Sequence, residues 1–406
     1  MNSESPLETM EPRALGARLR DAREARGWTQ QQLSDQLGVA RTTIVAIEKG
    51  ERRIKPKELV EIAALLGRSV SDFLQRAISV EGFSVQLRGS LPPPTTLEAG
   101  LAPHIDEFQR LCEDYARLEE LCQAPLRRRY PPEYDIHGTE PELAAEDVAS
   151  SERRRLDLGE GPLVNLREVI ESDVGLRVFQ MELPSKVAGM FAFADQVGAC
   201  IAVNLLHPSE RRRASMAHEF GHFLTARYRS EITFEARYER KPSGERFAEA
   251  FARSFLMPAA GLRRRYLELE RERSKGLTLG DVCRLAHFYV VSVEAMTRRL
   301  EEIRLIPLGT WDRLRQERFK VREAQQLLGL EPVHDDNDKF SARYIALAVE
   351  AWQQEQLSEG QLARFLRTDR LGARERIQRL EATSFDDSDQ GEFINLAMPF
   401  LKSAGR

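Results

Sequence analysis

Three residues in the stretch SMAHEFGHFLTARY, residues 215–228, have types and spacing suited to catalysis at a metal ion: His218, Glu219 and His222. On a helix, residues four apart project from one face, so both imidazoles would point at the same spot. The glutamate between them would lie beside the metal without binding it. There it could take a proton from bound water and pass it to a leaving amine. The stretch therefore predicts a metal site with Glu219 as its base.

A third metal ligand is needed to support this interpretation. The chain has 7 histidines in 406 residues, so chance matches to the spacing are expected on the order of 0.01 times. Zinc sites with two histidines and one glutamate take that glutamate from a following helix, and GERFAEAFARSFLMP supplies Glu245. Glu249, one turn later, is placed to accept the free N–H of a ligating histidine. The alternative is a solvated acidic face that pairs with Arg246 and Arg253. We predict one Zn²⁺ per chain.

The stretch GWTQQQLSDQLGVARTTIVAIEKGERR near the N-terminus has the features of a helix-turn-helix. Thr29 and Gln32 form a capping box that begins one helix, and Gly38 ends that helix at the turn. The small core between the two helices is expected to contain Leu33, Leu37, Val39, Ile44 and Ile47. The second helix would present four side chains to a DNA major groove: Arg41, Thr42, Thr43 and Ala46.

Charge is distributed unevenly along the chain. The formal net charge of the whole chain is −4, whereas residues 12–58 contain eleven Lys or Arg against six Asp or Glu. This local excess of five positive charges has the right sign for phosphate contacts, so double-stranded DNA is the expected partner. The alternative is a small helical interaction domain that never touches DNA. If DNA is bound as two half-sites, a homodimer is expected.

The hydrophobic pattern divides the chain into a helical first part, a mixed middle and a helical end. Three short strand-like runs, at 175–181, 189–195 and 199–206, precede the histidine helix, and a helix is expected over 104–122. We interpret 226–245 as a basic, aromatic loop beside the cleft, and 89–96 and 333–339 as linkers. Ser358 to Gln361 is a capping-box start for a late helix.

These patterns predict a multidomain, mainly α protein with one α+β domain. The expected parts are a helix-turn-helix domain (12–76), a linker and connector helix (77–135), a metallopeptidase domain (136–308) and a helical C-terminal region (309–406). The four cysteines lack paired spacing and suggest reduced thiols. The N-terminus has no signal-peptide pattern, and no apolar run of about 18 residues occurs, so we expect a cytoplasmic protein without a membrane partner.

The N-terminal stretch WTQQQLSDQLGVARTTIVAIEKGER resembles the phage-repressor-like (XRE-type) helix-turn-helix family over roughly residues 13–75. The resemblance implies phosphate contacts for Gln30, Arg52 and Arg53, and base-edge positions for Arg41, Thr42 and Ala46. The chain departs at Ala40, where the family commonly has Ser or Thr. We expect the lost helix cap to cost about 1 kcal/mol.

Residues from about 140 to 305 resemble the ImmA/IrrE family of metallopeptidases, which implies a zincin-like, thermolysin-like arrangement. The resemblance rests on MAHEFGHFL and on a downstream segment matched at Glu245, Ala248, Phe251, Ala252, Leu256, Met257 and Pro258. The chain departs at Glu249, where the family has Asn, and at Ala214, where it usually has Phe. Asn204, at the end of a strand, is then expected to lie where that strand edge binds extended substrate.

The family role implied by this resemblance is cleavage of helix-turn-helix repressors, which releases stress, mobile-element or defence genes. We therefore predict a DNA-binding transcriptional regulator with a gated zinc endopeptidase domain that acts on a repressor or another regulatory protein. Two alternatives belong to a different class. One is a transcriptional regulator whose metal site is structural or sensory, and the other is an antitoxin-like protein that neutralises a partner by binding.

Overall fold

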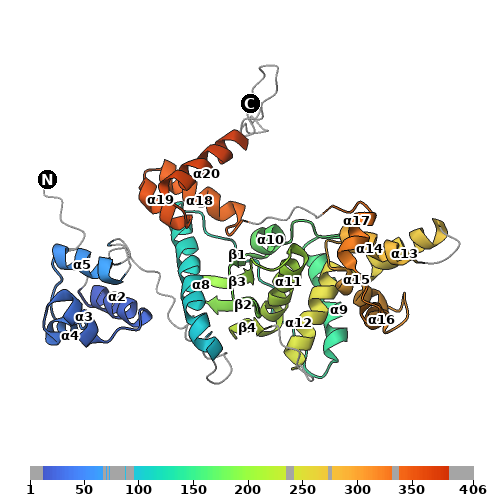
Figure 1. Ribbon diagram of the computed structural model, residues 1–406, viewed down its shortest axis with the longest axis horizontal. Coiled ribbons are helices and arrows are strands. Elements are labelled where there is room, and N and C mark those ends of the chain that lie inside the picture. Colours follow the sequence, from blue (N-terminus) through green and yellow to red (C-terminus); the bar gives the residue numbers. More distant parts are fainter. Residues whose placement is uncertain are drawn as a thin grey trace, which may run out of the picture. The chain divides into compact units, whose positions relative to one another are not determined.

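The structure is a computed structural model that divides into two compact units, Met1–Ser79 and Val80–Arg406 (Figure 1). The residues it describes are 12–66, 70, 73, 87, 96–234, 242–272, 277–331 and 338–383. The linkers predicted at 89–96 and 333–339 lie mostly outside these residues.

The first unit is a small bundle of four described helices, α2 (Pro12–Ala25), α3 (Gln30–Leu37), α4 (Arg41–Glu48) and α5 (Pro56–Leu66). The predicted capping box begins α3, and Gly38 ends it with a left-handed φ of 65°. Ala40 precedes α4 without a side-chain cap. The predicted core is confirmed: Leu33, Ile44 and Ile47 are buried, and Leu37 and Val39 pack partly buried against them.

A four-stranded mixed sheet lies at the centre of the second unit, in the order β1-β3-β2-β4. The strands are β1 (Arg177–Met181), β2 (Val187–Ala194), β3 (Gly198–Asn204) and β4 (Glu231–Phe234). β1 is parallel to β3, and β2 is antiparallel to both β3 and β4. The three predicted strands are confirmed. The predicted loop at 226–245 is wrong over the four residues of β4, whose pairing with β2 is non-local.

On one face of the sheet, α11 (Ser209–Ala226) packs against β2 and β3, α12 (Ser243–Leu256) packs against α11, and α9 (Pro141–Arg155) packs against α12 (Figure 1). Phe220 of α11 meets the rings of Phe251 and Phe255 at centroid distances of 5.7 and 5.6 Å. A Cβ built on Gly221 would lie 3.2 Å from both Ala248 Cα and Phe251 Cδ1. The glycine therefore lets α12 approach α11 closely.

The other face of the sheet is covered by α8 (Thr96–Leu121) and α18 (Ala342–Gln353). Tyr115 of α8 contacts Phe179 of β1 and Tyr344 of α18 edge-on, at centroid distances of 6.0 and 5.1 Å. The buried Glu171 carboxylate accepts hydrogen bonds from the Tyr115 hydroxyl (2.7 Å) and the Ser341 hydroxyl (2.9 Å). Helices from before and after the sheet in sequence therefore share one buried cluster.

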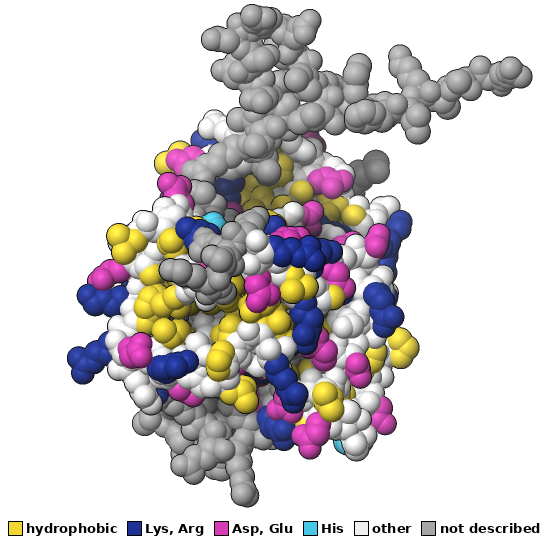
Figure 2. Space-filling view, turned by 90° about the vertical axis from the view of Figure 1, so that its right-hand side faces the viewer, with side chains coloured by type: hydrophobic (Ala, Val, Ile, Leu, Met, Phe, Trp, Pro, Cys, Tyr) yellow, Lys and Arg dark blue, Asp and Glu magenta, His cyan; other side chains and the backbone are white. Residues whose placement is uncertain are grey.

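The second unit contains further described helices besides those that cover the sheet. They are α10 (Leu166–Glu168), the π-helical turn η1 (Val169–Val174), α13 (Ala259–Glu272), α14 (Leu279–Phe288), α15 (Val293–Glu302), α16 (Thr310–Gln316), α17 (Val321–Leu327), α19 (Glu359–Phe365) and α20 (Arg370–Thr383). Figure 2 shows the side on which α13 to α17 lie, with hydrophobic side chains gathered among charged ones. Leu327 of α17 is 88% exposed.

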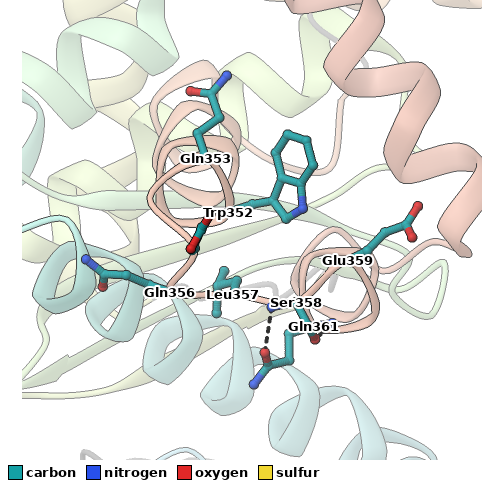
Figure 3. A pocket seen from close by; sticks show the side chains of 8 residues that line it. Trp352, Gln353, Gln356, Leu357, Ser358, Glu359 and Gln361 are labelled. Carbon is teal, nitrogen blue, oxygen red and sulfur yellow. Dashed lines mark hydrogen bonds between the residues drawn. The ribbon is translucent and has the colours of Figure 1, made fainter.

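The turn between α18 and α19 borders a shallow pocket (Figure 3). Its lining residues are Trp352, Gln353, Glu355, Gln356, Leu357, Ser358, Glu359 and Gln361. The Ser358 N–H donates to Gln361 Oε1, and the Gln361 N–H donates to the Ser358 hydroxyl, which confirms the predicted capping box. Within the described part of the chain, no helix is long and apolar enough to cross a membrane.

Candidate metal centre

The loop between β3 and α11 is held by buried polar side chains. Asn204 Nδ2 donates to the carbonyls of Leu183, Pro184 and Val187, and its Oδ1 accepts from the N–H of Leu206. β3 pairs with β1 on one side and with β2 on the other, so it has no free edge. The expectation that Asn204 marks a substrate-binding strand edge is therefore wrong. Its side chain instead ties the end of β3 to the loop between β1 and β2.

Two histidines of α11 and one glutamate of α12 converge on one point. His218 Nε2 lies 3.0 Å from His222 Nε2. The Glu245 carboxylate lies 3.3 Å from His222 Nε2 and 3.6 Å from His218 Nε2. Tetrahedral zinc with bonds of about 2.0–2.1 Å places neighbouring ligand atoms about 3.3–3.4 Å apart. The donor types and their spacing fit a zinc ion held by three protein ligands.

The two arginines of α12 have other partners. Arg246 pairs with Glu142 at 2.8 Å and with Glu140 at 3.2 Å, and Arg253 pairs with Glu302 at 2.7 Å. Glu245 instead faces the two histidines. A solvated acidic face that neutralises these arginines, the alternative considered from the sequence, does not describe Glu245.

Glu219 lies beside this cluster and is fully buried. Neither of its carboxylate oxygens has a hydrogen-bond partner among the described residues. The Thr233 hydroxyl lies close, but not in the geometry of a hydrogen bond. Burial is the main cause that raises the pKa of Glu219 to about 8, and the negative charges of Glu231 and Glu245 add to it. A carboxylate with this pKa can both accept and donate a proton near neutral pH.

Gly189 of β2 makes room for Glu219. A Cβ at position 189 would lie 2.6 Å from Glu219 Oε1, closer than real Cβ contacts allow. The sheet therefore approaches the carboxylate through a residue without a side chain. The sequence analysis did not single out Gly189, because a glycine inside an apolar strand has no local signal for what packs against it.

The charged groups of the cluster shift one another's pKa values. Burial alone would lower the pKa of His222, but the carboxylates of Glu245, Glu231 and Glu219 raise it to about 9. Burial would raise the pKa of Glu245, but the two histidines lower it to about 2. A buried pocket with three carboxylates and two imidazoles has the charge expected for binding a divalent cation.

A third carboxylate contacts the cluster from the sheet. Glu231 Oε2 of β4 lies 3.2 Å from His222 Nδ1, the ring nitrogen that faces away from Glu245. Sequence analysis missed this residue because it assigned 226–245 to a loop. The signal that could have found it is the run Glu-Ile-Thr-Phe at 231–234, whose alternation is typical of a short strand. Glu249 is half-buried on α12, and its hydrogen bond to a ligating histidine stays a prediction.

The residues predicted to contact DNA lie on or beside α3 and α4. Arg41, Thr42 and Arg53 are exposed, and Thr43 and Ala46 are half-buried. The Gln30 amide donates to Glu48 at 2.9 Å, and Arg52 pairs with Glu58 at 2.7 Å. Arg23 also pairs with Glu48 at 2.6 Å inside the bundle. Gln30 and Arg52 are thus bonded within the unit, and a phosphate would have to compete with Glu48 and Glu58 for these two side chains.

Comparison with known proteins identifies both units. Residues 19–73 match the family model described as helix-turn-helix, and residues 171–301 match the peptidase family model described as IrrE N-terminal-like domain. The chain therefore joins a helix-turn-helix domain of the XRE type to an IrrE-like metallopeptidase-like domain. This class of architecture is the one expected from the sequence.

Similarity to other proteins is otherwise low. No curated protein matches the chain. Among solved structures, ComR from Streptococcus suis is 12% identical with a TM-score of 0.16, and the match covers 92% of this chain and 90% of that one. PlcR from Bacillus thuringiensis, solved with the peptide PapR7 and DNA, is also 12% identical with a TM-score of 0.16, over 92% and 97% of the two chains.

Proposed function

We propose that this protein is a DNA-binding transcriptional regulator whose second unit is a zinc-dependent endopeptidase. The observation that carries the proposal is the convergence of His218, His222 and Glu245 beside the buried carboxylate of Glu219. Three ligands leave one tetrahedral position for water or substrate, which is the arrangement of catalytic rather than structural zinc sites. A helix-turn-helix repressor or another regulatory protein in the cytoplasm is the substrate class that we infer.

The chain's own residues would perform the proton transfers. Zinc held by His218, His222 and Glu245 would polarise a peptide carbonyl and make water a stronger acid at neutral pH. Glu219 would take a proton from the attacking water and return it to the leaving amine. Because Gly189 has no side chain, this carboxylate has room against the sheet beside the proposed ligands.

An extended segment of substrate would bind at β4. Among the described residues, this strand pairs only with β2, and no described strand lies on its second edge. Extended peptides add to such edges through main-chain hydrogen bonds. β4 begins at Glu231, which contacts His222, so a peptide on this edge would lie beside the metal ligands. β4 therefore takes the substrate-binding role that the sequence analysis gave to the strand ending at Asn204.

The first unit would place the peptidase at an operator. Arg41, Thr42 and Thr43 at the start of α4 would enter the major groove, while Arg53, Arg52 and Gln30 would contact phosphates. Two copies of the chain would bind two half-sites. His218 and His222 are only 7% and 3% exposed, so we also propose that access to the metal is gated.

The test compares new protein N-termini in cells that express the unaltered chain or Glu219→Gln, with and without DNA damage. A cut in one regulatory protein that disappears in Glu219→Gln would support the proposal and name the substrate. Glu182→Gln, an exposed carboxylate near the sheet, is the matched control and should cut normally. Both variants should retain zinc. No cut that depends on Glu219, with zinc and DNA binding intact, would refute the peptidase function.

The low exposure of the site also favours a second candidate. A regulator or antitoxin-like protein could keep the metal as a structural or sensory element, and a nearly closed site suits that role. Regulation of the target genes would then survive Glu219→Gln but not the loss of a metal ligand. Regulation lost in both variants would instead support the peptidase.

A further inference from the structure

The two ring nitrogens of His222 face different carboxylates. Nε2 lies 3.3 Å from Glu245 and 3.0 Å from His218 Nε2, whereas Nδ1 lies 3.2 Å from Glu231 Oε2. An imidazole that gives one nitrogen to a metal carries its proton on the other. A carboxylate that accepts this proton fixes the tautomer, orients the ring and makes the ligating nitrogen more basic. Glu231 occupies that position for His222.

Glu231 comes from a different element than the sequence predicts. The carboxylate expected to support a ligand, Glu249, lies on α12, the same helix as Glu245. The carboxylate that faces His222 Nδ1 lies on β4, and Glu231 pairs across the sheet with Phe191 of β2. The orientation of His222 therefore depends on the register of β4 against β2. A shift of β4 by one residue would turn this side chain to the opposite face of the sheet.

We infer that Glu231 is a positioning residue that supports the metal ligand His222 from the edge strand, and thereby links zinc retention to the strand proposed to receive substrate. This inference rests on the proposed function. It follows that a peptide paired with β4 stabilises the contact between Glu231 and His222. Disorder of β4 weakens the metal site without altering any of the three ligands.

The test is zinc affinity, measured on the full-length chain by competition with a chromophoric chelator. Glu231→Ala should bind zinc about 10–100-fold more weakly, the range typical for loss of a partner to a metal-ligating histidine. Glu231→Gln keeps an oxygen acceptor without the charge and should fall between Glu231→Ala and the unaltered chain. Glu182→Ala, with a side chain 60% exposed, is the matched control and should bind as the unaltered chain does.

Two further measurements separate positioning from other roles. The visible spectrum of the cobalt-substituted protein should show the same coordination number in Glu231→Gln as in the unaltered chain. The melting temperature of the zinc-free protein should not fall in the Glu231 variants, because each variant loses one of the three crowded carboxylates of Glu219, Glu231 and Glu245. If Glu231→Ala does not fold, the Gln variant still tests the inference.

Unchanged zinc affinity in both variants would overturn the inference. So would a changed cobalt coordination number, because Glu231 would then be a ligand. Either result leaves the proposed peptidase intact. Failure of the unaltered chain to bind zinc would overturn the proposed function together with the inference.

Discussion

The two units place their candidate functional residues in opposite ways. In the first unit, Arg41, Thr42 and Arg53 are exposed on or beside α4. Short stretches of sequence determine this helix pair: the capping box before α3, the glycine between α3 and α4, and a small apolar core. In the second unit, the candidate site is buried. It combines side chains from α11, β4 and α12, three consecutive elements whose side chains meet only when the sheet and helices pack together.

This difference determines how each site should respond to mutation. An exposed DNA-binding surface consists of nearly independent contacts, so a substitution should cost its own contact and little else. A buried metal centre is coupled, because each carboxylate alters the pKa of the others and the sheet and helices pack against them. We therefore expect large, linked effects in the second unit and small, separate ones in the first.

The largest expected effect is the loss of a metal ligand. His222→Ala removes one of three ligands and the histidine that Glu231 contacts, so the purified chain should lose its equivalent of zinc. Zinc per chain can be measured by atomic absorption. Affinity for a non-specific DNA duplex should stay within about twofold, because the substitution changes none of the residues predicted to contact DNA. A large parallel loss of DNA affinity would show that the two units are coupled.

A smaller effect is expected from filling the space beside the base. Gly189→Ala would place a Cβ 2.6 Å from Glu219 Oε1, so the carboxylate must move. We expect a loss of about 1–3 kcal/mol in the free energy of unfolding, as for other overpacked cores. Zinc should remain bound, because no ligand is touched. Gly161→Ala, with nothing within 4 Å of the added Cβ, is the control for urea unfolding. Equal stability of the two variants would contradict the packing argument.

In the first unit, the expected change concerns salt dependence. Arg53→Ala should reduce the slope of log affinity against log salt by about one and weaken binding evenly across sequences, as expected for one phosphate contact. The measurement is fluorescence anisotropy with a non-specific duplex. Arg322→Ala changes an exposed arginine in α17 and should leave the slope unaltered. An unchanged slope in Arg53→Ala would remove this residue from the DNA interface.

The smallest expected effect is a gain in the stability of α4. Ala40 has the extended backbone of a helix cap, with φ −68° and ψ 144°, but no side-chain acceptor. Ala40→Ser should stabilise α4 by about 0.5–1 kcal/mol by accepting a backbone N–H of the first turn. Amide hydrogen exchange in α4 of the full-length chain should slow accordingly. Exchange that does not slow would mean that the turn already satisfies these groups.

The sequence predicts local features of this molecule well and pairings between distant segments poorly. The capping boxes at Thr29 and Ser358, three of the four strands and the helices that bring His218, His222 and Glu245 together all follow from spacing and periodicity. β4 was missed because the alternation of its four residues is brief and lies within a basic, aromatic stretch interpreted as a loop, and because its pairing with β2 is non-local. The same error concealed Glu231. The substrate-binding edge was placed at Asn204 because the family resemblance implied it, and β3 has neighbours on both sides.

The cluster shared by α8, the sheet and α18 has a consequence for the order of folding during synthesis. Phe234 completes the sheet, but Tyr344 follows it by 110 positions. At about 5–20 residues per second, this interval lasts roughly 5 to 20 seconds on the ribosome. Throughout it, Tyr115 and Phe179 have no contact with Tyr344, and Glu171 lacks the hydroxyl of Ser341. The nascent chain thus exposes an aromatic surface until its C-terminal third emerges. The complete metal-binding fold therefore depends on residues far beyond Glu245, the last proposed ligand along the chain.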